Sequence, residues 1–332
     1  MLISVLIVNW NGASLLRSCL DALKNQTFKD FEIILIDNGS TDDSATMVID
    51  NYPEVQLIVL PENRGFAGGN NLAAGEAKGE WLVLLNNDVI AESSWLATLA
   101  VAAESNKGFA GFASCQLSYE DPEILDGAGD DYHCSGRVWR RGVGERFGPP
   151  WNEKMEVFSP CGATAMYKKD IFMSCGGFDE DFFCYLEDVD LGFRLRLLGH
   201  RFLYVPEARV RHVGSASKGR GSDFARYFGH RNLVWTFFKN MPSALFWRYL
   251  VLHLFLNLMS VLFFSVQGQG GTIFKAKWHA LKALPSVFQK RRQIQADIRV
   301  DTQQIEEIFA YGLGGLFWGH KTLKGVAPKG LS

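Results

Sequence analysis

The chain has 332 residues, of which 47% are apolar and 21% are charged. This length suits one large α/β domain or two smaller ones around a real hydrophobic core. The formal net charge of -2 lacks the basic excess of nucleic-acid-binding proteins, so we expect no nucleic-acid partner. No two of the six cysteines have C-x-x-C spacing, and we expect buried free thiols in a reducing cytoplasm.

Short apolar runs alternate with helical stretches in the first third of the chain. We expect strands at Leu2–Val8, Phe31–Ile36, Val55–Leu60, Trp81–Leu85 and Gly111–Ser114. We expect helices at Leu15–Leu23, Asp42–Asn51 (capped by Ser40 or Thr41), Ala67–Ala77 and Trp95–Glu104 (opened by Ser93 or Ser94). Strands that are apolar on both faces predict an α/β fold with a Rossmann-like, mostly parallel sheet flanked by helices.

The apolar N-terminus has no basic stretch before it and no cleavage site, so it favours a first strand over a signal peptide and predicts a cytoplasmic protein. Residues 118–158 are rich in Gly, Asp, Arg and aromatics and predict an irregular, acceptor-facing insertion. Regular structure is expected again at Gly162–Tyr167, Leu186–Leu198 and Phe202–Val205. The sequence pattern changes near Asn232, where a long apolar stretch and then basic residues follow. This change predicts a first domain over 1–232 and a helical region over 233–332.

Four polar clusters follow expected strands: Asn9–Gly12, Asp37–Asp42, Asn63–Asn71 and Asn86–Asp88. Ligands bind beyond the carboxyl ends of such strands, so the four clusters should line one crevice. A carboxylate at Asp37 suits a base or ribose, with helix capping as the alternative. Arg64 and the glycines at a helix start suit a phosphate. Neither a G-x-G-x-x-G fingerprint nor a P-loop is present, which argues against a nicotinamide enzyme or an NTPase.

Three further features could carry chemistry. Asp88 could hold Mg²⁺ or Mn²⁺ against a diphosphate, although a turn without function is an open alternative. Glu187 and Asp188 open a helix, where either could be a general base or simply favour the helix dipole. His212 precedes a Gly-, Ser- and Lys-bearing loop, Gly214–Gly221, which suits a diphosphate lid.

Together these segments resemble the family 2 glycosyltransferases of the GT-A fold, in the form of the rhamnosyltransferase-like branch. The resemblance runs from Ile3 to about Gly221 and rests on five motifs in order: Val5–Asn11, Asp37–Asp42, Asn63–Asn71, Asn86–Asp88, and Phe183–Leu191 with Arg194. His212 matches a histidine that some members use as a further metal ligand. The D-x-D position reads Asn-Asn-Asp, so the first acid is missing and Asp88 matches the last.

The resemblance implies inversion by a single displacement. Asp188, together with Glu187, is implied as catalytic, and Asp188 is preferred as the base. A divalent metal, Mn²⁺ or Mg²⁺, is implied at Asp88 and His212. The implied contacts of the nucleotide sugar are Asn9, Asn11, Asp37, Asn63, Arg64 and Asn87. The implied partners are a nucleotide-diphosphate sugar, with dTDP-rhamnose as the candidate donor, and a lipid-linked or polysaccharide acceptor in cell-surface glycan synthesis.

Leu245–Val266 is a 22-residue, almost continuously apolar stretch, about 33 Å as a helix at ~1.5 Å per residue. Arg248 and Asn257 interrupt it, and basic residues lie on both flanks, which argues against a simple span. Phe274–Phe288 mixes Lys with Trp, Leu and Val, as an interfacial helix does. We therefore expect association with the cytoplasmic face of the membrane; a true span, a soluble helical core and a homodimer interface are the alternatives.

Two other function classes remain open from the sequence. A nucleotidyltransferase could use a similar sheet. A module that binds nucleotide or membrane without turnover is the second alternative, and the set of Asp88, Asp188 and His212 argues against it.

Overall fold

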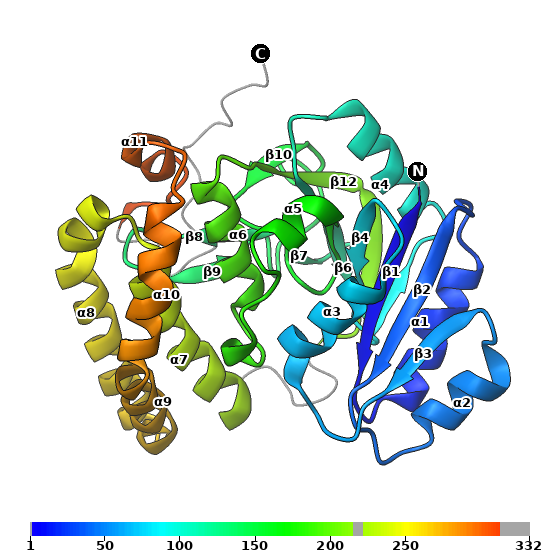
Figure 1. Cartoon of the computed structure of the whole chain (residues 1–332), viewed down its shortest axis with the longest axis horizontal. Coiled ribbons are helices and arrows are strands. Elements are labelled where there is room, and N and C mark those ends of the chain that lie inside the picture. The colour runs from blue at the N-terminus through cyan, green and yellow to red at the C-terminus, as the bar shows by residue number, and fades with distance from the viewer. Residues whose placement is uncertain (1, 215–221, 313–332) are drawn as a thin grey trace.

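The computed structural model describes residues 2–214 and 222–312 and has a mixed sheet between two layers of helices (Figure 1). The strand order is β10-β12-β6-β11-β4-β1-β2-β3, with β5 paired to β12 and β7 to β6. The strands are β1 Ile3–Asn9, β2 Phe31–Asp37, β3 Val55–Val59, β4 Trp81–Leu84, β5 Val89–Ala91, β6 Gly111–Ser118, β7 Leu125–Gly127, β8 Asp130–Tyr132, β9 Val138–Arg140, β10 Met155–Val157, β11 Ala165–Lys168 and β12 Phe202–His212.

The helices of the first two thirds of the chain are short and cover both faces of the sheet. They are α1 Ala13–Lys24, α2 Ser44–Asn51, α3 Gly65–Glu76, α4 Trp95–Ser105, α5 Lys169–Ser174, the 3-10 turn η1 Glu180–Phe182 and α6 Glu187–Leu197. One core cluster joins the sheet to α1, α2 and α4, and a second joins its other face to α3, α5 and α6. The expected α/β layering is confirmed.

The pairing of the strands brings several motif turns to one edge of the sheet. Strands β1, β2, β3 and β4 run parallel, with Asn9 of β1 opposite Asp37 of β2. Strands β6 and β12 are also parallel, and β11 lies antiparallel between β4 and β6. The long central strands thus confirm the expected parallel core, and their carboxyl ends meet on one side.

Several local expectations were wrong. Residues 118–158 contain four short strands, β7 to β10, rather than wholly irregular chain. Strand β12 continues past a bulge between Val205 and Arg209 and ends only at His212. Helix α2 has Asp43 at its N-cap, without a side-chain cap, because Ser40 and Thr41 bond to Asn11 instead. Ser94 does stand at the N-cap of α4.

The six cysteines are free, as expected, but two of them, Cys175 and Cys184, are only half-buried. The helices from residue 223 onward gather beyond α6, on the far side of the molecule from β1–β3 (Figure 1). They are α7 Asp223–Asn240, α8 Ser243–Val266, α9 Gly270–Lys282, α10 Leu284–Ala296 and α11 Thr302–Glu306. The expected apolar run is α8, the stretch 274–288 is divided between α9 and α10, and the expected boundary at 232/233 lies inside α7.

Candidate active site

The turns at the ends of β1 and β2 are joined by side-chain hydrogen bonds. Asn9 Nδ2 donates to Asp37 Oδ2 at 3.3 Å, and Asn87 Nδ2 donates to Asn9 Oδ1 at 2.7 Å. Asp37 Oδ1 accepts from the Ser40 backbone N–H at 2.9 Å, and Asn11 Oδ1 from that of Thr41 at 2.7 Å. Asp37 is fully buried. Four of the expected nucleotide-sugar residues, Asn9, Asn11, Asp37 and Asn87, therefore form one connected wall.

The two remaining expected contacts lie in the turn before α3. Asn63 Oδ1 accepts from Asn38 Nδ2 at 3.0 Å and from the Gly65 backbone N–H at 2.8 Å, so this side chain shapes the turn. Gly65 has φ +73°, and a Cβ there would overlap with the carbonyl oxygen of Phe183. The Arg64 guanidinium is half-exposed and lies 3.0 Å from a carboxylate oxygen of Glu180. Arg64 is thus paired to an acid and not free for an anion.

Asp88 and His212 come together at the edge where β4 and β12 end, as expected for a metal pair. His212 Nε2 lies 3.3 Å from Asp88 Oδ1, and both side chains are buried. His212 Nδ1 is 2.6 Å from Asp126 Oδ2, which fixes the ring and its tautomer. Burial lowers the pKa of His212, but the hydrogen bonds to Asp126 and Asp88 outweigh it and raise that pKa above its ordinary value.

Asp88 Oδ1 is buried and makes no well-aligned hydrogen bond to any described residue. The His212 Nε2 at 3.3 Å is its one close polar neighbour among those described above, and a divalent cation between this oxygen and the imidazole nitrogen would satisfy both. Metal-bound histidines commonly hold a carboxylate on their other nitrogen, as His212 holds Asp126. The residues present therefore fit a metal ion. Asp126 was not predicted from the sequence as a partner of His212. The one feature that could have indicated it is that an acid stands in the glycine-containing run Asp126–Asp130.

Asp188 lies in the first turn of α6, and hydrogen bonds connect it to the Asn86–Asp88 turn. Its Oδ2 accepts from the Gly162 backbone N–H at 2.7 Å, and Oδ1 accepts from Val189 N–H at 2.8 Å. The residue after Gly162, Ala163, accepts from Asn86 N–H at 2.9 Å, so two adjacent residues link Asp188 to the Asn86–Asp88 turn. The helix N-terminus favours a charged carboxylate at this position.

Glu187 has a different environment from its neighbour. Burial, then the charges of Asp188 and Asp190, raise the pKa of Glu187 well above its ordinary range. Its Oε2 is buried and has no partner among the described residues. Burial and the neighbouring acids therefore favour the protonated form of Glu187, which is poorly suited to accept a proton, and this leaves Asp188 as the better candidate for a general base.

The turn before α6 is strained. Phe183, Tyr185 and Leu186 have φ of +64°, +68° and +65°, in the left-handed region that non-glycine residues rarely adopt. Such residues cost about 1–3 kcal/mol each and persist only where their surroundings hold them. This strain lies directly before Glu187 and Asp188, where it sets the direction in which α6 begins.

With this geometry in place, the chain was compared with known proteins. The family model "Glycosyl transferase family 2" matches residues 4–175, more than half of the chain. The chain belongs to glycosyltransferase family 2. The resemblance drawn from the motifs is thereby confirmed, and the protein is a glycosyltransferase.

Two curated relatives extend the match beyond that model. The chain is 28% identical over 273 residues to an N-acetylglucosaminyl-diphospho-decaprenol L-rhamnosyltransferase of Mycobacterium tuberculosis, covering 74% of this chain and 86% of that one. It is 29% identical over 228 residues to the O-antigen biosynthesis protein RfbC of Myxococcus xanthus. That second match covers 65% of this chain but only 18% of the relative's length.

Solved structures show that the glycosyltransferase has the GT-A fold. GalNAc-T7 with UDP, GalNAc and Mn²⁺ has a TM-score of 0.58 at 19% identity, over 71% of this chain and 47% of that one. A mannosyltransferase of Pyrobaculum calidifontis in complex with GDP-Man and Mn²⁺ has a TM-score of 0.54 at 18% identity, over 89% and 83%.

A second acidic group of the glycosyltransferase lies beside the base. Ligand atoms of Asp130, Cys161 and Asp188 all lie within 4.8 Å of one another. Burial raises the pKa of the Cys161 thiol to about 12, and Arg140 Nε already lies 3.5 Å from Asp130 Oδ1. A neutral thiol and a resident guanidinium make this a poor metal site. The group instead brings an acid and an arginine of the 118–158 insertion next to Asp188.

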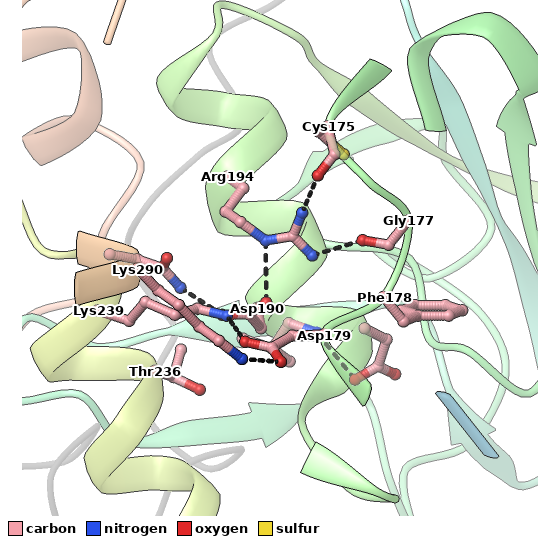
Figure 2. A network of polar contacts seen from close by, with 12 residues as sticks. Cys175, Gly177, Phe178, Asp179, Asp190, Arg194, Thr236, Lys239 and Lys290 are labelled. Atoms are coloured by element: carbon pink, nitrogen blue, oxygen red, sulfur yellow. Dashed lines mark hydrogen bonds and ion pairs between the residues drawn. The ribbon is translucent and has the colours of Figure 1, made fainter. Parts of the chain in front are cut away.

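Buried ion pairs hold the base helix of the glycosyltransferase in its position (Figure 2). Asp190, fully buried, lies 3.0 Å from Arg194 Nε on α6 and 2.7 Å from Lys239 Nζ on α7. Lys239 also contacts Asp179 at 2.6 Å, and Lys290 of α10 contacts the other oxygen of Asp179 at 2.5 Å. The i, i+4 pair of Asp190 and Arg194 thus forms part of a network that joins α6 to the C-terminal helices.

We expect Lys239→Met to destabilise the protein by about 3–5 kcal/mol, because removing one partner leaves buried carboxylates uncompensated. Denaturant unfolding followed by fluorescence measures the change. The matched control, Arg248→Met, breaks the exposed pair with Glu306 and should change stability little. A stability of Lys239→Met equal to that of the control would show that the network contributes nothing.

Asp179 gives this network a pH dependence. Burial alone would raise the pKa of Asp179, but Lys239 and Lys290 outweigh it and hold that pKa well below its ordinary value. The resulting stability is present above the unfolded pKa of about 4 and is lost as the pH falls through the folded pKa. Below pH ~4 the unfolding free energy should therefore fall more steeply in the wild type than in Asp179→Asn. Parallel slopes in the two proteins would contradict this.

Proposed function

We propose that this glycosyltransferase moves a sugar, of the rhamnose class, from a nucleotide-diphosphate donor to a hydroxyl of a lipid-linked or polysaccharide acceptor in cell-surface glycan synthesis, with inversion. The observation that carries the proposal is the buried group of Asp88, His212 and Asp126, whose turn is linked through Ala163 and Gly162 to the proposed base Asp188. The donor and acceptor classes are supported by the rhamnosyltransferase relative, which the chain covers over 86% of its length.

The donor would bind at the carboxyl ends of β1, β2 and β4. Asn9, Asn11, Asp37 and Asn87 form the wall toward the nucleoside, and Asn63 with Arg64 forms the turn beside it. For Arg64 to contact the diphosphate, its pair with Glu180 must open. Asp88 and His212 would hold a divalent metal, Mn²⁺ or Mg²⁺, which offsets the charge of the leaving diphosphate. The lid expected at Gly214–Gly221 lies outside the described residues except for Gly214.

Asp188 takes the proton of the acceptor hydroxyl. The oxygen freed of that proton forms its bond to the anomeric carbon while the bond to the nucleoside diphosphate breaks. Attack and departure on opposite faces invert the configuration. Glu187 is buried beside Asp188, and its raised pKa favours the protonated form, so Asp188 and not Glu187 is the proposed base.

A product assay tests the proposal. The protein is incubated with a panel of UDP-, GDP- and dTDP-sugars, Mn²⁺ and a polyprenyl diphosphate-linked sugar. We expect mass spectrometry to show one added sugar from one donor class, and NMR to show the inverted anomeric linkage. Transfer of a nucleotidyl group would favour a nucleotidyltransferase, and binding without turnover would favour a non-catalytic module; either would overturn the proposal.

The C-terminal helices support an association with the cytoplasmic face of a membrane. Helix α8 is the one described helix long and apolar enough to cross a bilayer, and only 6% of its most apolar window is buried. Its outer face exposes large apolar side chains: Trp247, Val251, Leu254, Phe255, Leu258, Leu262, Phe263 and Val266. Helix α9 adds exposed Phe274, Trp278 and Leu281, with Lys275 and Lys282 beside them. An apolar face bordered by lysines suits anionic lipid headgroups.

Helix α8 is tied to the catalytic domain by its inner face. His253 is fully buried, its Nδ1 lies 2.8 Å from the Ser135 carbonyl oxygen, and its ring stacks on Phe237 with centroids 4.0 Å apart. A helix held along one side by protein has only its other side for lipid. The protein therefore lies on the membrane surface rather than spanning it, close to a lipid-linked acceptor.

Vesicle flotation tests this association. Anionic vesicles should bind the wild type, and the double variant Val251→Glu/Leu254→Glu should bind about 100-fold more weakly, because it loses two apolar contacts and adds two negative charges. The control is Val101→Glu on α4, an equally exposed apolar position on the other side of the molecule (Figure 1). Unchanged binding, or a lipid-free dimer that the same variant dissociates, would contradict membrane association and favour a dimer interface.

A further inference from the structure

The strained turn before the catalytic helix is held by one side chain of α7. Asn232 is fully buried, and its Nδ2 donates to the carbonyl oxygens of Phe182, Cys184 and Tyr185 at 3.0, 2.9 and 2.7 Å. An amide nitrogen has two hydrogens, so at least one of them is shared between carbonyls. Three carbonyls that converge on one donor fix the path of the turn through its left-handed residues.

The orientation of this amide is set by a neighbouring residue. Arg231 Nε donates to Asn232 Oδ1 at 2.8 Å, and this donor requires the oxygen, not the nitrogen, on that side. Arg231 Nη2 also donates to the carbonyl oxygens of Asp181 and Phe182 at 2.8 and 2.9 Å. Its guanidinium lies over the Trp235 ring, 4.1 Å from the centroid, which holds it against α7. Two consecutive residues of α7 thus donate hydrogen bonds to four backbone carbonyls, those of Asp181, Phe182, Cys184 and Tyr185.

The same turn makes backbone hydrogen bonds to both α3 and α6. Its Phe183 carbonyl accepts from the Ala67 backbone N–H at 3.2 Å, in the first turn of α3. Its Leu186 carbonyl accepts the first bond of α6, from Asp190 N–H at 2.9 Å. The turn therefore joins the donor-side helix α3 to the helix that carries Glu187 and Asp188. Any rotation of the turn would move the base relative to the donor.

We infer that Asn232 is a positioning residue for glycosyl transfer, which aims Asp188 by holding the left-handed turn 183–186. The inference rests on the proposed role of Asp188 as the base. It makes α7 a working part of the catalytic apparatus rather than the start of a separable membrane-binding region. Asn232 itself touches backbone carbonyls only, so its effect passes through the turn.

The test compares Asn232→Leu with a matched control on the same helix. Leucine has the branched shape of asparagine without its donor. Thr236→Val is the control, because Thr236 is equally buried one turn later and loses only its hydrogen bond to the Asn232 carbonyl oxygen. The full-length chain is used throughout. The readouts are kcat and the donor KM, the thermal midpoint, and hydrogen exchange of amides 183–188.

For Asn232→Leu we expect kcat to fall about 100-fold, the effect of a misplacement near 1 Å, with the donor KM changed by less than about threefold. Amides 183–188 should lose protection, while Thr236→Val keeps both kcat and protection. A kcat equal to that of the control, or unchanged exchange in the turn, would overturn the inference. If Asn232→Leu does not fold, Asn232→Ser keeps a donor for one carbonyl, and an intermediate loss of kcat is expected.

Failure of the proposed function and failure of the inference on Asn232 give different results. If the proposed function is wrong, the wild type, the control and the variant are all inactive with every donor, and hydrogen exchange at 183–188 still decides whether Asn232 holds the turn. If the inference alone is wrong, the wild type and Asn232→Leu turn over equally.

Discussion

Asp188→Asn should lower kcat by about 10²–10⁴-fold, because the acceptor hydroxyl loses its proton acceptor. The variant keeps the shape of the side chain, and its amide oxygen still accepts from the Gly162 backbone N–H. Donor affinity should therefore stay within a few-fold of the wild type. Steady-state kinetics with saturating donor measure kcat, and a separate binding experiment measures the donor affinity.

Glu187→Gln is the matched control for this prediction. Burial and the neighbouring acids raise the pKa of Glu187 well above its ordinary range, and glutamine has the shape and neutrality of the protonated form that this shift favours. We expect kcat to change by less than about tenfold, well below the effect of losing a general base. If Glu187→Gln were as damaging as Asp188→Asn, or Asp188→Asn stayed active, the assignment of the base would be wrong.

Asp88→Asn should reduce activity by at least about 10²-fold and make the remainder insensitive to EDTA, because the ion loses its one carboxylate ligand among the proposed residues. Asp126→Asn should act more mildly. It leaves both proposed ligands in place but loosens the His212 ring that it holds at 2.6 Å, so the metal affinity should fall about 10–100-fold. Activity measured at increasing Mn²⁺ concentrations distinguishes the Asp88→Asn variant from the Asp126→Asn variant.

The signature of the Asp126 variant is recovery at high metal concentration. Saturating Mn²⁺ should restore most of its activity, whereas no concentration should restore Asp88→Asn. Glu123→Gln, at an exposed acid of the same insertion, is the control and should titrate as the wild type does. Wild-type activity that survives EDTA would contradict a metal at this site.

The turns at the strand ends could be predicted from the sequence because of one physical rule. In a parallel core the carboxyl ends of the strands share one edge, so Asn9, Asp37 and Asp88 had to converge once their strands were located. The helix that Glu187 and Asp188 open was expected within Leu186–Leu198 and is found at Glu187–Leu197, and the chain leaves it through Gly199, which has φ +91°. Family membership followed from the same motifs and is confirmed.

The partners of these residues could not be predicted in the same way. Asp126 reaches His212 across 86 positions of the chain, and Asn232 reaches the Tyr185 carbonyl across 47. Neither pair has a local period or a spacing rule, because each depends on how distant elements pack. Arg64 shows the same limit: its charge and its helix-start position predicted a phosphate contact, but its pairing with Glu180 at 3.0 Å could not be read from the sequence.

The central claim is that this family 2 glycosyltransferase holds a nucleotide-diphosphate sugar through a metal at Asp88 and His212. Calorimetric titration of UDP-, GDP- and dTDP-sugars into the purified protein, with Mn²⁺ or Mg²⁺ and then with EDTA, tests it most directly. The account predicts that one nucleotide class binds, that EDTA weakens the binding, and that Asp88→Asn binds as the wild type does in EDTA. Absence of binding by every donor in a folded protein, or binding that EDTA and Asp88→Asn leave unchanged, would contradict it.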